Sequence, residues 1–421
     1  MALVTESVEA VCAQARRAAR KMASLETVVK DAALEAIAQA LDGNRDAILE
    51  ANAADLADAR DAGLSDALLD RLRLDERRLA AMAAGAREIA VLTDPVGELL
   101  EEQVRPNGLR IKKLRVPLGV VAVIYEARPN VTIDAAALCL KSGNAIVLRG
   151  SSSAGRSNAI LAAVAAAAAE AAGVPEGAIS ILSSGRREEL AELARQDRYV
   201  DLIIPRGGEG LKAALLEHAT VPVIYAASGN CHVYVDAAAD LERAQAIVLN
   251  AKVQRPGVCN AAETLLVHAA VADAFLPAAL QALGEAGVEL RVDERAAALA
   301  GPVPVVAALA EDWDTEYLAL TLAVGVVDSL DAAIEHIAAH GTGHSEAIVT
   351  SDRDSARRFE SDVDAACIYV NASTRFTDGG EFGMGAEIGN STQKLHARGP
   401  IGLRELCAAK YLVEGDGHVR S

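Results

Sequence analysis

The sequence predicts an α/β protein built around a doubly wound parallel sheet. Residues 118–204 alternate short apolar runs with longer helical stretches, which is the spacing of parallel strands joined by crossover helices. Residues 1–95 carry apolar side chains at helical spacing and show no strand alternation. Residues 98–117 form two alternating runs around a Pro-Asn-Gly turn. Together these observations predict a helical layer, a parallel sheet and a long β-hairpin.

The helical layer is predicted from the period of its apolar residues. One helix ends at Gly43, and its repeating apolar positions are Ala33, Leu34, Ile37, Ala38 and Leu41. Further helices are predicted over residues 45–62 and 75–92. Because no catalytic combination of residues occurs in this region, we expect it to be scaffold.

The predicted hairpin has two interpretations. Asn107-Gly108 between alternating runs is a strong hairpin signal. The hairpin is either a surface excursion or an arm that pairs with another subunit, and the tendency of exposed strand edges to find partners favours the arm. Residues 404–414 alternate enough to form a final strand.

The parallel sheet is predicted from four strands and the helices between them. Strands are expected over residues 119–125, 145–148, 179–182 and 200–204, and helices over 133–140, 156–172, 188–195 and 211–218. Ligands on such sheets bind at the carboxyl ends of the strands. Loops 149–153 and 205–210 both follow strands and precede helices, so either can hold a dinucleotide. For the serines of the first loop, helix capping is the alternative.

Composition excludes several classes of partner and site. A chain of 421 residues can form two or three domains. Its formal net charge of −18 argues against nucleic acid but leaves room for a small anionic substrate. The N-terminal residues resemble an amphipathic helix and not a signal peptide, and residues 160–172 are too short to span a bilayer. We therefore expect a cytoplasmic protein with no membrane contact, and its six cysteines, without CxxC spacing, to be free thiols.

The strongest candidate for chemistry is Cys259. A predicted helix, residues 241–253, ends before Arg255, Pro256 and Gly257, and a predicted strand follows at 264–267. This places Cys259 on irregular backbone, and Arg255 is close enough in sequence to favour the thiolate. The alternative is a small buried apolar residue at the start of a strand.

Four long stretches, in order along the chain, resemble the aldehyde dehydrogenase superfamily and, within it, the gamma-glutamyl phosphate reductase family. They are residues 116–158, 221–236, 254–268 and 382–406, and they include EARPN, RGSSS, QRPGVCN and FGMGAEIGN. The resemblance implies an aldehyde-dehydrogenase-like fold with a cofactor domain (residues 1–97 and 118–226), a catalytic domain (227–397) and an oligomerisation arm (98–117 and 398–414).

The resemblance also implies catalytic roles. Cys259 is the expected nucleophile, and Asn130 matches the asparagine whose amide binds the oxyanion together with the Cys259 N–H. The alternative for Asn130 is a cap of the helix after Pro129. Residues 226–230 lack the glutamate that activates water in aldehyde-oxidising relatives, so hydrolysis of a thioester should be slow.

The implied cofactor is NADPH. Arg149, Ser151 and Ser152 stand where many relatives hold an adenosine ribose, and no carboxylate in that stretch would repel a 2′-phosphate. The other residues expected to bind the cofactor are Gly207, Gly208, Ser228, Gly229 and Glu316, the last on the nicotinamide ribose. For Glu316 a solvated surface carboxylate is the alternative.

Five cationic residues are expected to bind the substrate: Arg128, Arg255, Lys394, His396 and Arg398. The last three lie in a glycine-rich loop, residues 382–400, for which solvation is the alternative. His336, His340 and His344 recur every four residues, but Gly341 and Gly343 end the helix and no carboxylate is set among them. We expect no metal site.

The implied reaction is reduction of L-glutamyl 5-phosphate to L-glutamate 5-semialdehyde and phosphate, through a Cys259 thioester, as a step of proline biosynthesis. Two alternatives stay open: another acyl-phosphate reductase or aldehyde dehydrogenase of this fold, and a non-catalytic nucleotide-binding protein. Expected partners are other copies of the chain, as a dimer or tetramer, and the upstream glutamate 5-kinase.

Overall fold

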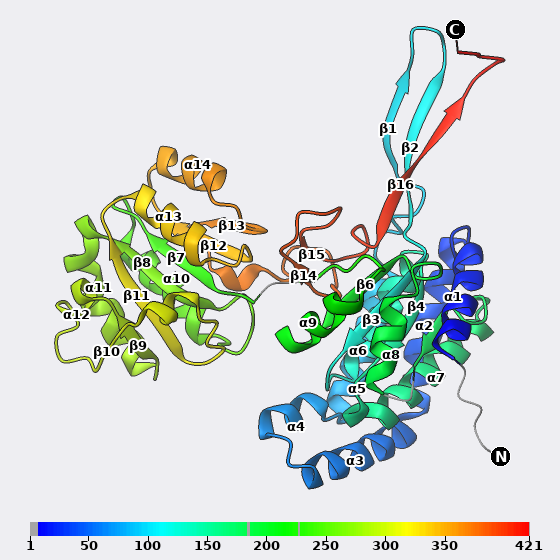
Figure 1. The fold of residues 1–421 in the computed structure, drawn as a ribbon, viewed down its shortest axis with the longest axis horizontal. Coiled ribbons are helices and arrows are strands. Elements are labelled where there is room, and N and C mark those ends of the chain that lie inside the picture. The colour runs from blue at the N-terminus through cyan, green and yellow to red at the C-terminus, as the bar shows by residue number, and fades with distance from the viewer. Residues whose placement is uncertain (1–6, 183–185, 226–227, 421) are drawn as a thin grey trace. The chain divides into compact units, whose positions relative to one another are not determined.

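The computed structural model describes residues 7–182, 186–225 and 228–420. The chain divides into two compact units (Figure 1). Unit 1 comprises Met1–Tyr225, Gly383–Gly389 and Ile401–Ser421, and unit 2 comprises Ala226–Phe382 and Asn390–Pro400. The chain therefore leaves unit 1 and returns to it twice.

The N-terminal region of unit 1 is helical, as its period predicts. Its helices are α1 (Val8–Met22), α2 (Thr27–Gly43), α3 (Arg45–Asp61), α4 (Asp66–Leu72) and α5 (Glu76–Ala90). The apolar positions predicted for α2 are all buried, because α2 packs against α5 and α7. Among the described residues, no helix combines the length and the apolar composition needed to cross a bilayer.

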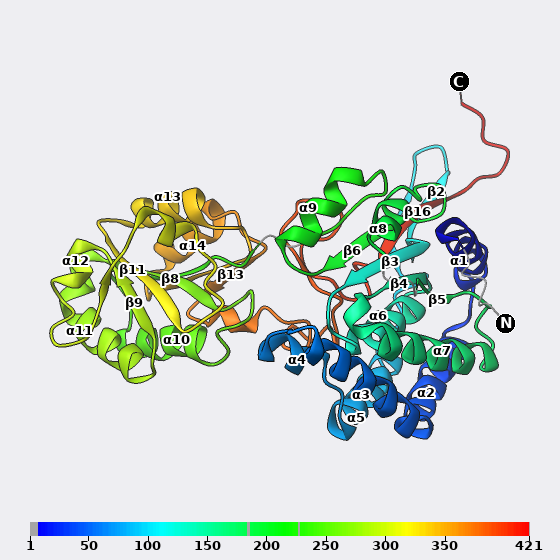
Figure 2. The same ribbon diagram turned by 60° about the horizontal axis from the view of Figure 1, so that its bottom comes forward.

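The parallel sheet of unit 1 has the strand order β5-β4-β3-β6 and is parallel throughout. The strands are β3 (Val120–Tyr125), β4 (Ala145–Arg149), β5 (Ile179–Ile181) and β6 (Leu202–Arg206). Helices α6 (Asn130–Lys141) and α7 (Gly155–Ala171) cover one face, and α1, α8 (Arg187–Ala194) and α9 (Glu209–His218) cover the other (Figure 2). All six residues of β3 are buried, as expected of a strand covered on both faces.

One strand of this sheet lies further along the chain than predicted. The sequence predicts residues 200–204, whereas β6 spans Leu202–Arg206. The N–H groups of Tyr199 and Val200 both donate to the Gln196 carbonyl, so these two residues close a turn. Pairing with β3 begins only at Leu202, opposite Val121.

The predicted hairpin and final strand form one antiparallel sheet of order β1-β2-β16. The strands are β1 (Leu99–Val104), β2 (Arg110–Pro117) and β16 (Cys407–Glu414). Gly108 takes a φ of 91° in the turn, which explains the Asn-Gly pair. We call this sheet the arm, and it extends away from the helices of its own unit (Figure 1). Every residue of β1 is exposed.

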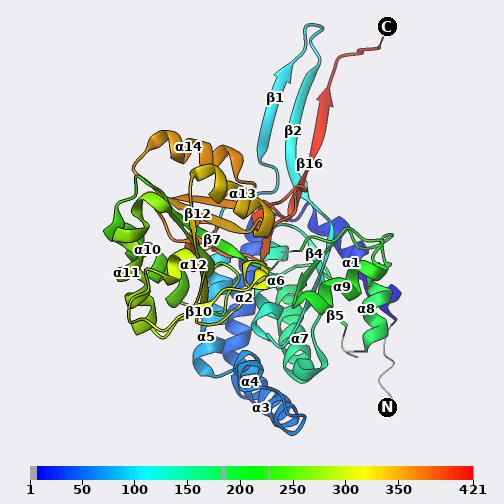
Figure 3. The same cartoon turned by 60° about the vertical axis from the view of Figure 1, so that its left-hand side comes forward.

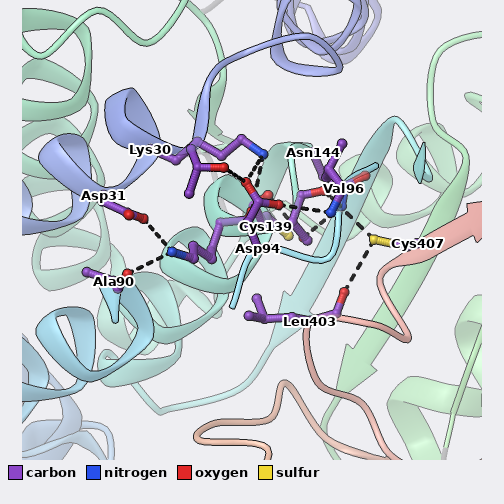
Figure 4. A network of polar contacts seen from close by, with 12 residues as sticks. Lys30, Asp31, Ala90, Asp94, Val96, Cys139, Asn144, Leu403 and Cys407 are labelled. Atoms are coloured by element: carbon purple, nitrogen blue, oxygen red, sulfur yellow. Dashed lines mark hydrogen bonds and ion pairs between the residues drawn. The ribbon is translucent and has the colours of Figure 1, made fainter. Parts of the chain in front are cut away.

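A polar network anchors the base of the arm (Figure 4). Lys30 of α2 donates to Asp94 at 2.7 Å, and Lys141 of α6 bonds to Asp31 and, at 2.7 Å, to the Ala90 carbonyl. The side chain of Asn144 accepts the Gly119 N–H at 2.8 Å and donates to the Leu406 carbonyl at 2.9 Å. The entrances to β3 and β16 are therefore held together by one side chain.

Unit 2 is a second α/β layer around seven parallel strands of order β10-β9-β11-β8-β7-β12-β13. These strands are β7 (Cys231–Val235), β8 (Ala262–His268), β9 (Glu289–Val292), β10 (Val306–Ala307), β11 (Thr321–Val327), β12 (Ser345–Val349) and β13 (Cys367–Val370). The helices are α10 (Leu241–Val253), α11 (Ala269–Glu285), α12 (Glu294–Ala297), α13 (Leu330–His340) and α14 (Arg353–Asp362). Short elements complete the unit: η2 (Ala310–Asp314), η3 (Thr374–Phe376), β14 (Asn390–Ser391) and β15 (Gly399–Pro400).

The strands of unit 2 send alternate residues into two cores. On β8, Leu265 and Val267 join the core under α10 and α11, while Leu266 faces the core under α13 and α14. Figure 3 shows these helix pairs on opposite faces of the sheet. Because side chains alternate along a strand, burial on both faces makes β8 apolar almost throughout. The structure therefore confirms the α/β fold class.

Candidate active site

Cys259 lies between the end of α10 and the start of β8, on the irregular backbone that the sequence predicts. It is exposed, whereas the other five cysteines are buried. The structure therefore contradicts the alternative in which Cys259 is a buried apolar residue. Its carbonyl oxygen lies 3.2 Å from the Sγ of the buried Cys231, which fixes the backbone of the loop from below.

Gly229 lies directly against the backbone of Cys259. A Cβ placed on Gly229 would lie 1.7 Å from the Cys259 carbonyl oxygen and 2.7 Å from its Cα, so only glycine fits there. The Gly229 N–H donates to Glu316 Oε1 at 2.7 Å. The structure thus brings together three residues that sequence analysis singled out from separate segments. The carboxylate of Glu316 therefore contacts the backbone of residue 229, although residues 226–230 contain no carboxylate of their own.

The segment carrying Glu316 is held by a buried ion pair. Glu263 Oε1 accepts the Leu318 N–H at 3.2 Å, and Glu263 Oε2 lies 2.5 Å from Lys252 Nζ. Leu318 has a φ of 52°, an uncommon conformation for leucine that this bond helps to hold. Burial raises the pKa of Glu263 to about 7, although Lys252 opposes the rise. The segment of Glu316 is therefore held in place by hydrogen bonds, which is not expected of a solvated surface carboxylate.

One cation near Cys259 was missed by sequence analysis. Arg375, in η3, donates from Nε to Gln254 at 2.9 Å and from Nη1 to the Asn260 side chain. It therefore bridges residues on both sides of Cys259. Burial lowers the pKa of Arg375, Arg255 lowers it further, and Cys259 raises it, so all three groups are electrostatically close. No sequence spacing links position 375 to the Cys259 loop.

The predicted cationic loop is organised around one acidic residue. Lys394 pairs with Asp364, and Arg398 donates to the Asp364 carboxylate at 2.8 Å. These two hydrogen bonds, together with the charges of Lys394 and Arg398, lower the pKa of Asp364. His396 lies between them in sequence. The contacts described for Lys394 and Arg398 therefore run to Asp364.

In unit 1, the carboxyl ends of three strands bring the other predicted residues together. Ile124 lies opposite Arg149, and Tyr125 lies opposite Arg206, so the loops after β3, β4 and β6 leave the same edge of the sheet. These loops carry Arg128 and Asn130, then Ser151 and Ser152, then Gly207 and Gly208. This is the edge where ligands bind on parallel sheets.

The Asn130 amide is oriented by a carboxyl group one turn along α6. Asn130 is the first residue of α6, and its Nδ2 donates to Asp134 Oδ2 at 2.9 Å. It makes no capping bond, because the cap position is Pro129. The helix-capping alternative is therefore wrong. Burial raises the pKa of Asp134 to about 6, and Asn130 and Arg206 oppose that rise.

Serine capping is not what shapes the loop after β4. Neither η1 (Ser152–Ala154) nor α7 has a side-chain cap, and Ser151 instead accepts the Ala127 N–H at 3.1 Å. Arg149 donates to the Arg186 carbonyl at 3.1 Å. Glu189, only 4% exposed, lies close enough to raise the pKa of Arg149, while burial lowers it more. The loop itself holds no carboxylate, but α8 supplies one near Arg149 from outside the loop.

The loop before α9 also holds a carboxylate. The Gly208 N–H at the start of the helix donates to Glu126 at 3.3 Å. A Cβ on Gly207 would lie 2.7 Å from the Glu126 carboxyl carbon, so the two loops approach closely. A carboxylate therefore lies at the helix N-terminus in a loop for which the sequence predicts a dinucleotide, a position that favours negative charge.

The three spaced histidines do not converge. His336 and His340 lie on α13 with their rings 4.6 Å apart, and His340 pairs with Asp314 at 2.8 Å. His344 lies beyond the helix, fully buried, and bonds Ser345 at 2.8 Å. Within the described part of the chain, no group of three acidic, histidine or cysteine side chains has the arrangement of a metal site. Of the stretch 226–230, positions 226 and 227 lie outside the described residues, whereas Ser228 is described.

Comparisons with known proteins agree with one another. Residues 2–304 match the model of the aldehyde dehydrogenase family. The gamma-glutamyl phosphate reductase of Moorella thermoacetica is 58% identical over 97% of both chains, and that of Thermobifida fusca is 55% identical over 99% of both. The crystal structure of the Thermotoga maritima gamma-glutamyl phosphate reductase matches 99% of this chain and 100% of its own, with a TM-score of 0.96 and 46% identity.

Proposed function

Because the chain belongs to the aldehyde dehydrogenase family, and within it to the gamma-glutamyl phosphate reductases, we propose that it reduces L-glutamyl 5-phosphate to L-glutamate 5-semialdehyde and phosphate with NADPH, a step of proline biosynthesis. The observation that carries this proposal within the molecule is Cys259. It is the exposed cysteine among six, on a loop pinned by Gly229 and Cys231. A thiol so placed can attack a carbonyl carbon from a fixed position.

The chain's own groups account for the acyl transfer. The Cys259 thiolate attacks the acyl carbon, the carbon–phosphate oxygen bond breaks, and phosphate leaves with the electron pair. The Asn130 amide and the Cys259 N–H stabilise the oxyanion, a contribution of about 3 kcal/mol for one such donor. The product is a thioester on Cys259. NADPH, when bound, would supply the hydride that reduces this thioester, so that Cys259 could leave the aldehyde product as the thiolate.

The residues of unit 1 fit a phosphorylated dinucleotide. Arg149 Nε is buried and has no hydrogen-bond partner among the described residues. Such a donor is costly to leave unpaired, and a ribose phosphate would satisfy it. Gly150, Ser151 and Ser152, which follow Arg149 in the chain, line a small recess. Gly207, Gly208, Ser228, Gly229 and Glu316 would contact the remainder of the cofactor.

We also propose a role for each part of the chain. We assign cofactor binding to residues 1–97 and 118–226, catalysis to 227–397, and oligomerisation to the arm segments 98–117 and 398–414. The exposed edges of β1 and β16 support pairing with another copy of the chain. Arg128, Lys394, His396 and Arg398 are assigned to the substrate. A cytoplasmic location and an association with glutamate 5-kinase, which would shield a labile acyl phosphate, complete the proposal.

The reverse reaction tests this function. NADPH formation from glutamate semialdehyde is measured with and without phosphate, for wild type and Cys259→Ser. We expect turnover that requires phosphate and is lost in the variant. Turnover without phosphate would mean that water releases the acyl group, which identifies an aldehyde dehydrogenase and makes Glu316 the first candidate base. A wild-type protein that binds NADPH but turns over no acyl phosphate would be a nucleotide-binding protein.

A further inference from the structure

We infer that Arg375 and Arg255 form an oxyanion-binding subsite beside Cys259 that takes the phosphate group of the substrate. This inference rests on the proposed function and deepens it, since it assigns one end of the substrate to named residues. Arg375 lies far from Cys259 in sequence and outside every motif that predicts the reaction.

The position of Arg375 is fixed on both sides of the nucleophile. Its guanidinium reaches Gln254 before Cys259 and Asn260 after it. In return, the Asn260 side chain donates to the Thr377 carbonyl at 2.9 Å, and Thr374 donates to the Asn260 carbonyl at 2.7 Å. These bonds lock η3 to the loop, so Arg375 keeps its place when the loop is empty.

Buried hydroxyl groups hold η3 from the other side. Thr377 Oγ1 lies 2.6 Å from both Ser345 and Tyr369, and Ser345 bonds His344 at 2.8 Å. Ser345 and His344 are fully buried. Buried hydrogen bonds therefore fix the element that carries Arg375, as a specific anion site requires.

The two arginines are like charges close enough for Arg255 to lower the pKa of Arg375. Among the residues that the structure describes, neither Arg255 nor Arg375 forms an ion pair with a carboxylate, although the chain carries a net charge of −18. Asp378 is the acidic group near Arg375, and its Oδ1 accepts the Gly380 N–H at 2.8 Å. Burial lowers the pKa of Arg375, and the charge of Arg255 lowers it further. An anion bound between them would offset both.

The structure of the substrate indicates which of its two anionic groups binds at this subsite. The phosphate is bonded to the carbon that Cys259 attacks, whereas the α-carboxylate lies at the far end of the glutamyl chain. A cation within electrostatic reach of the thiol therefore meets the phosphate. Arginine is suited to it, because its planar fork binds two phosphate oxygens at once and favours the departing dianion.

The test uses inorganic phosphate as the probe and alkylation of Cys259 by iodoacetamide as the readout. The full-length protein is compared with Arg375→Gln, Arg375→Lys and Arg255→Gln. The control is Arg357→Gln, which removes an exposed arginine of α14 in the same unit. We expect phosphate to slow alkylation of wild type and control equally. Arg375→Gln should raise the half-protecting concentration about tenfold or more, and Arg375→Lys should raise it less, since lysine keeps charge without the fork.

The competing results are distinct. If phosphate protects wild type and Arg375→Gln equally, the inference is overturned, and Arg375 only stabilises the loop. In that case the substitution would change the alkylation rate measured without phosphate, but not its dependence on phosphate. If Arg375→Gln loses protection by L-glutamate but keeps protection by phosphate, the subsite binds the carboxylate, and the inference is overturned as well. No phosphate protection of wild type would also refute the subsite, while phosphate-dependent turnover, measured separately, would still establish the function. If Arg375→Gln fails to fold, Arg375→Lys and Arg255→Gln decide.

Discussion

The contact between Gly229 and Cys259 makes a sharp prediction for Gly229→Ala. A new Cβ would lie 1.7 Å from the Cys259 carbonyl oxygen, where side-chain carbons essentially never come within 3.0 Å. The obstructing atoms belong to backbone, so no side-chain rotation relieves the clash. The φ of Gly229 lies outside the left-handed region, so the cost is steric and not conformational.

The size of the effect follows from the displacement. The two backbones must separate by more than an ångström, and a shift of about 1 Å at a nucleophile typically costs on the order of 100-fold in rate. That loss equals about 2.7 kcal/mol of transition-state stabilisation. Overpacking of this kind also costs about 1–3 kcal/mol of stability. We therefore expect kcat to fall about 100-fold and Tm to fall by a few degrees.

The assay is NADPH formation from glutamate semialdehyde with saturating phosphate, alongside a thermal unfolding scan. Gly85→Ala is the control, because a Cβ there meets nothing within 4 Å and the residue lies in the helix α5. We expect the control to match wild type in kcat. A Gly229→Ala enzyme within threefold of wild-type kcat would show that the loop relaxes freely, and the rigid placement of Cys259 would be refuted.

Three further outcomes follow from other features. Lys252→Met should destabilise the protein by about 3–5 kcal/mol at high pH, because it leaves a buried carboxylate unpaired. The loss should shrink as pH falls, because Glu263, whose pKa is about 7 beside Lys252, takes up a proton at a higher pH once that lysine is removed; urea unfolding across this pH range would show a constant loss if this is wrong. Asp134→Leu should lower kcat about tenfold with little change in KM, because the Asn130 amide loses the acceptor that orients it. In wild type kcat should fall below about pH 6, where Asp134 takes up a proton, and a variant with the same pH profile would count against this role. Tyr411→Asp, on the exposed outer strand of the arm, should shift the oligomer toward smaller species in light scattering, and an unchanged mass would contradict the arm's proposed role.

Most of the fold could be predicted from local sequence patterns. The helix predicted over residues 241–253 has the bounds of α10, Leu241–Val253, and an Asn-Gly pair located the turn of the arm. These features depend on residues near one another in sequence, which a single sequence displays. The predicted start of β6 was wrong because tertiary pairing with β3, and not local propensity, decides where that strand begins.

The site was predictable where it rests on recognisable segments and not where it rests on packing. Cys259, Gly229 and Glu316 could each be named from the sequence, although only folding puts the second against the first. Arg375 could not be named, because its approach to the Cys259 loop depends on η3 and the buried hydroxyl groups beneath it. Glu189 likewise reaches Arg149 from another helix, and no property of the loop 149–153 indicates it.

The pairing of β2 with β16 has a consequence for synthesis of the chain. Lys112 and Glu414, which bond across these strands, are 302 residues apart. At the usual 5–20 residues per second, a ribosome needs about 15 to 60 s to make the chain between them. Throughout that interval β2 presents an open edge, the kind of surface through which nascent chains on one messenger associate. Residues 407–414 close that edge only once they have emerged, so the hairpin stays open to other chains until then.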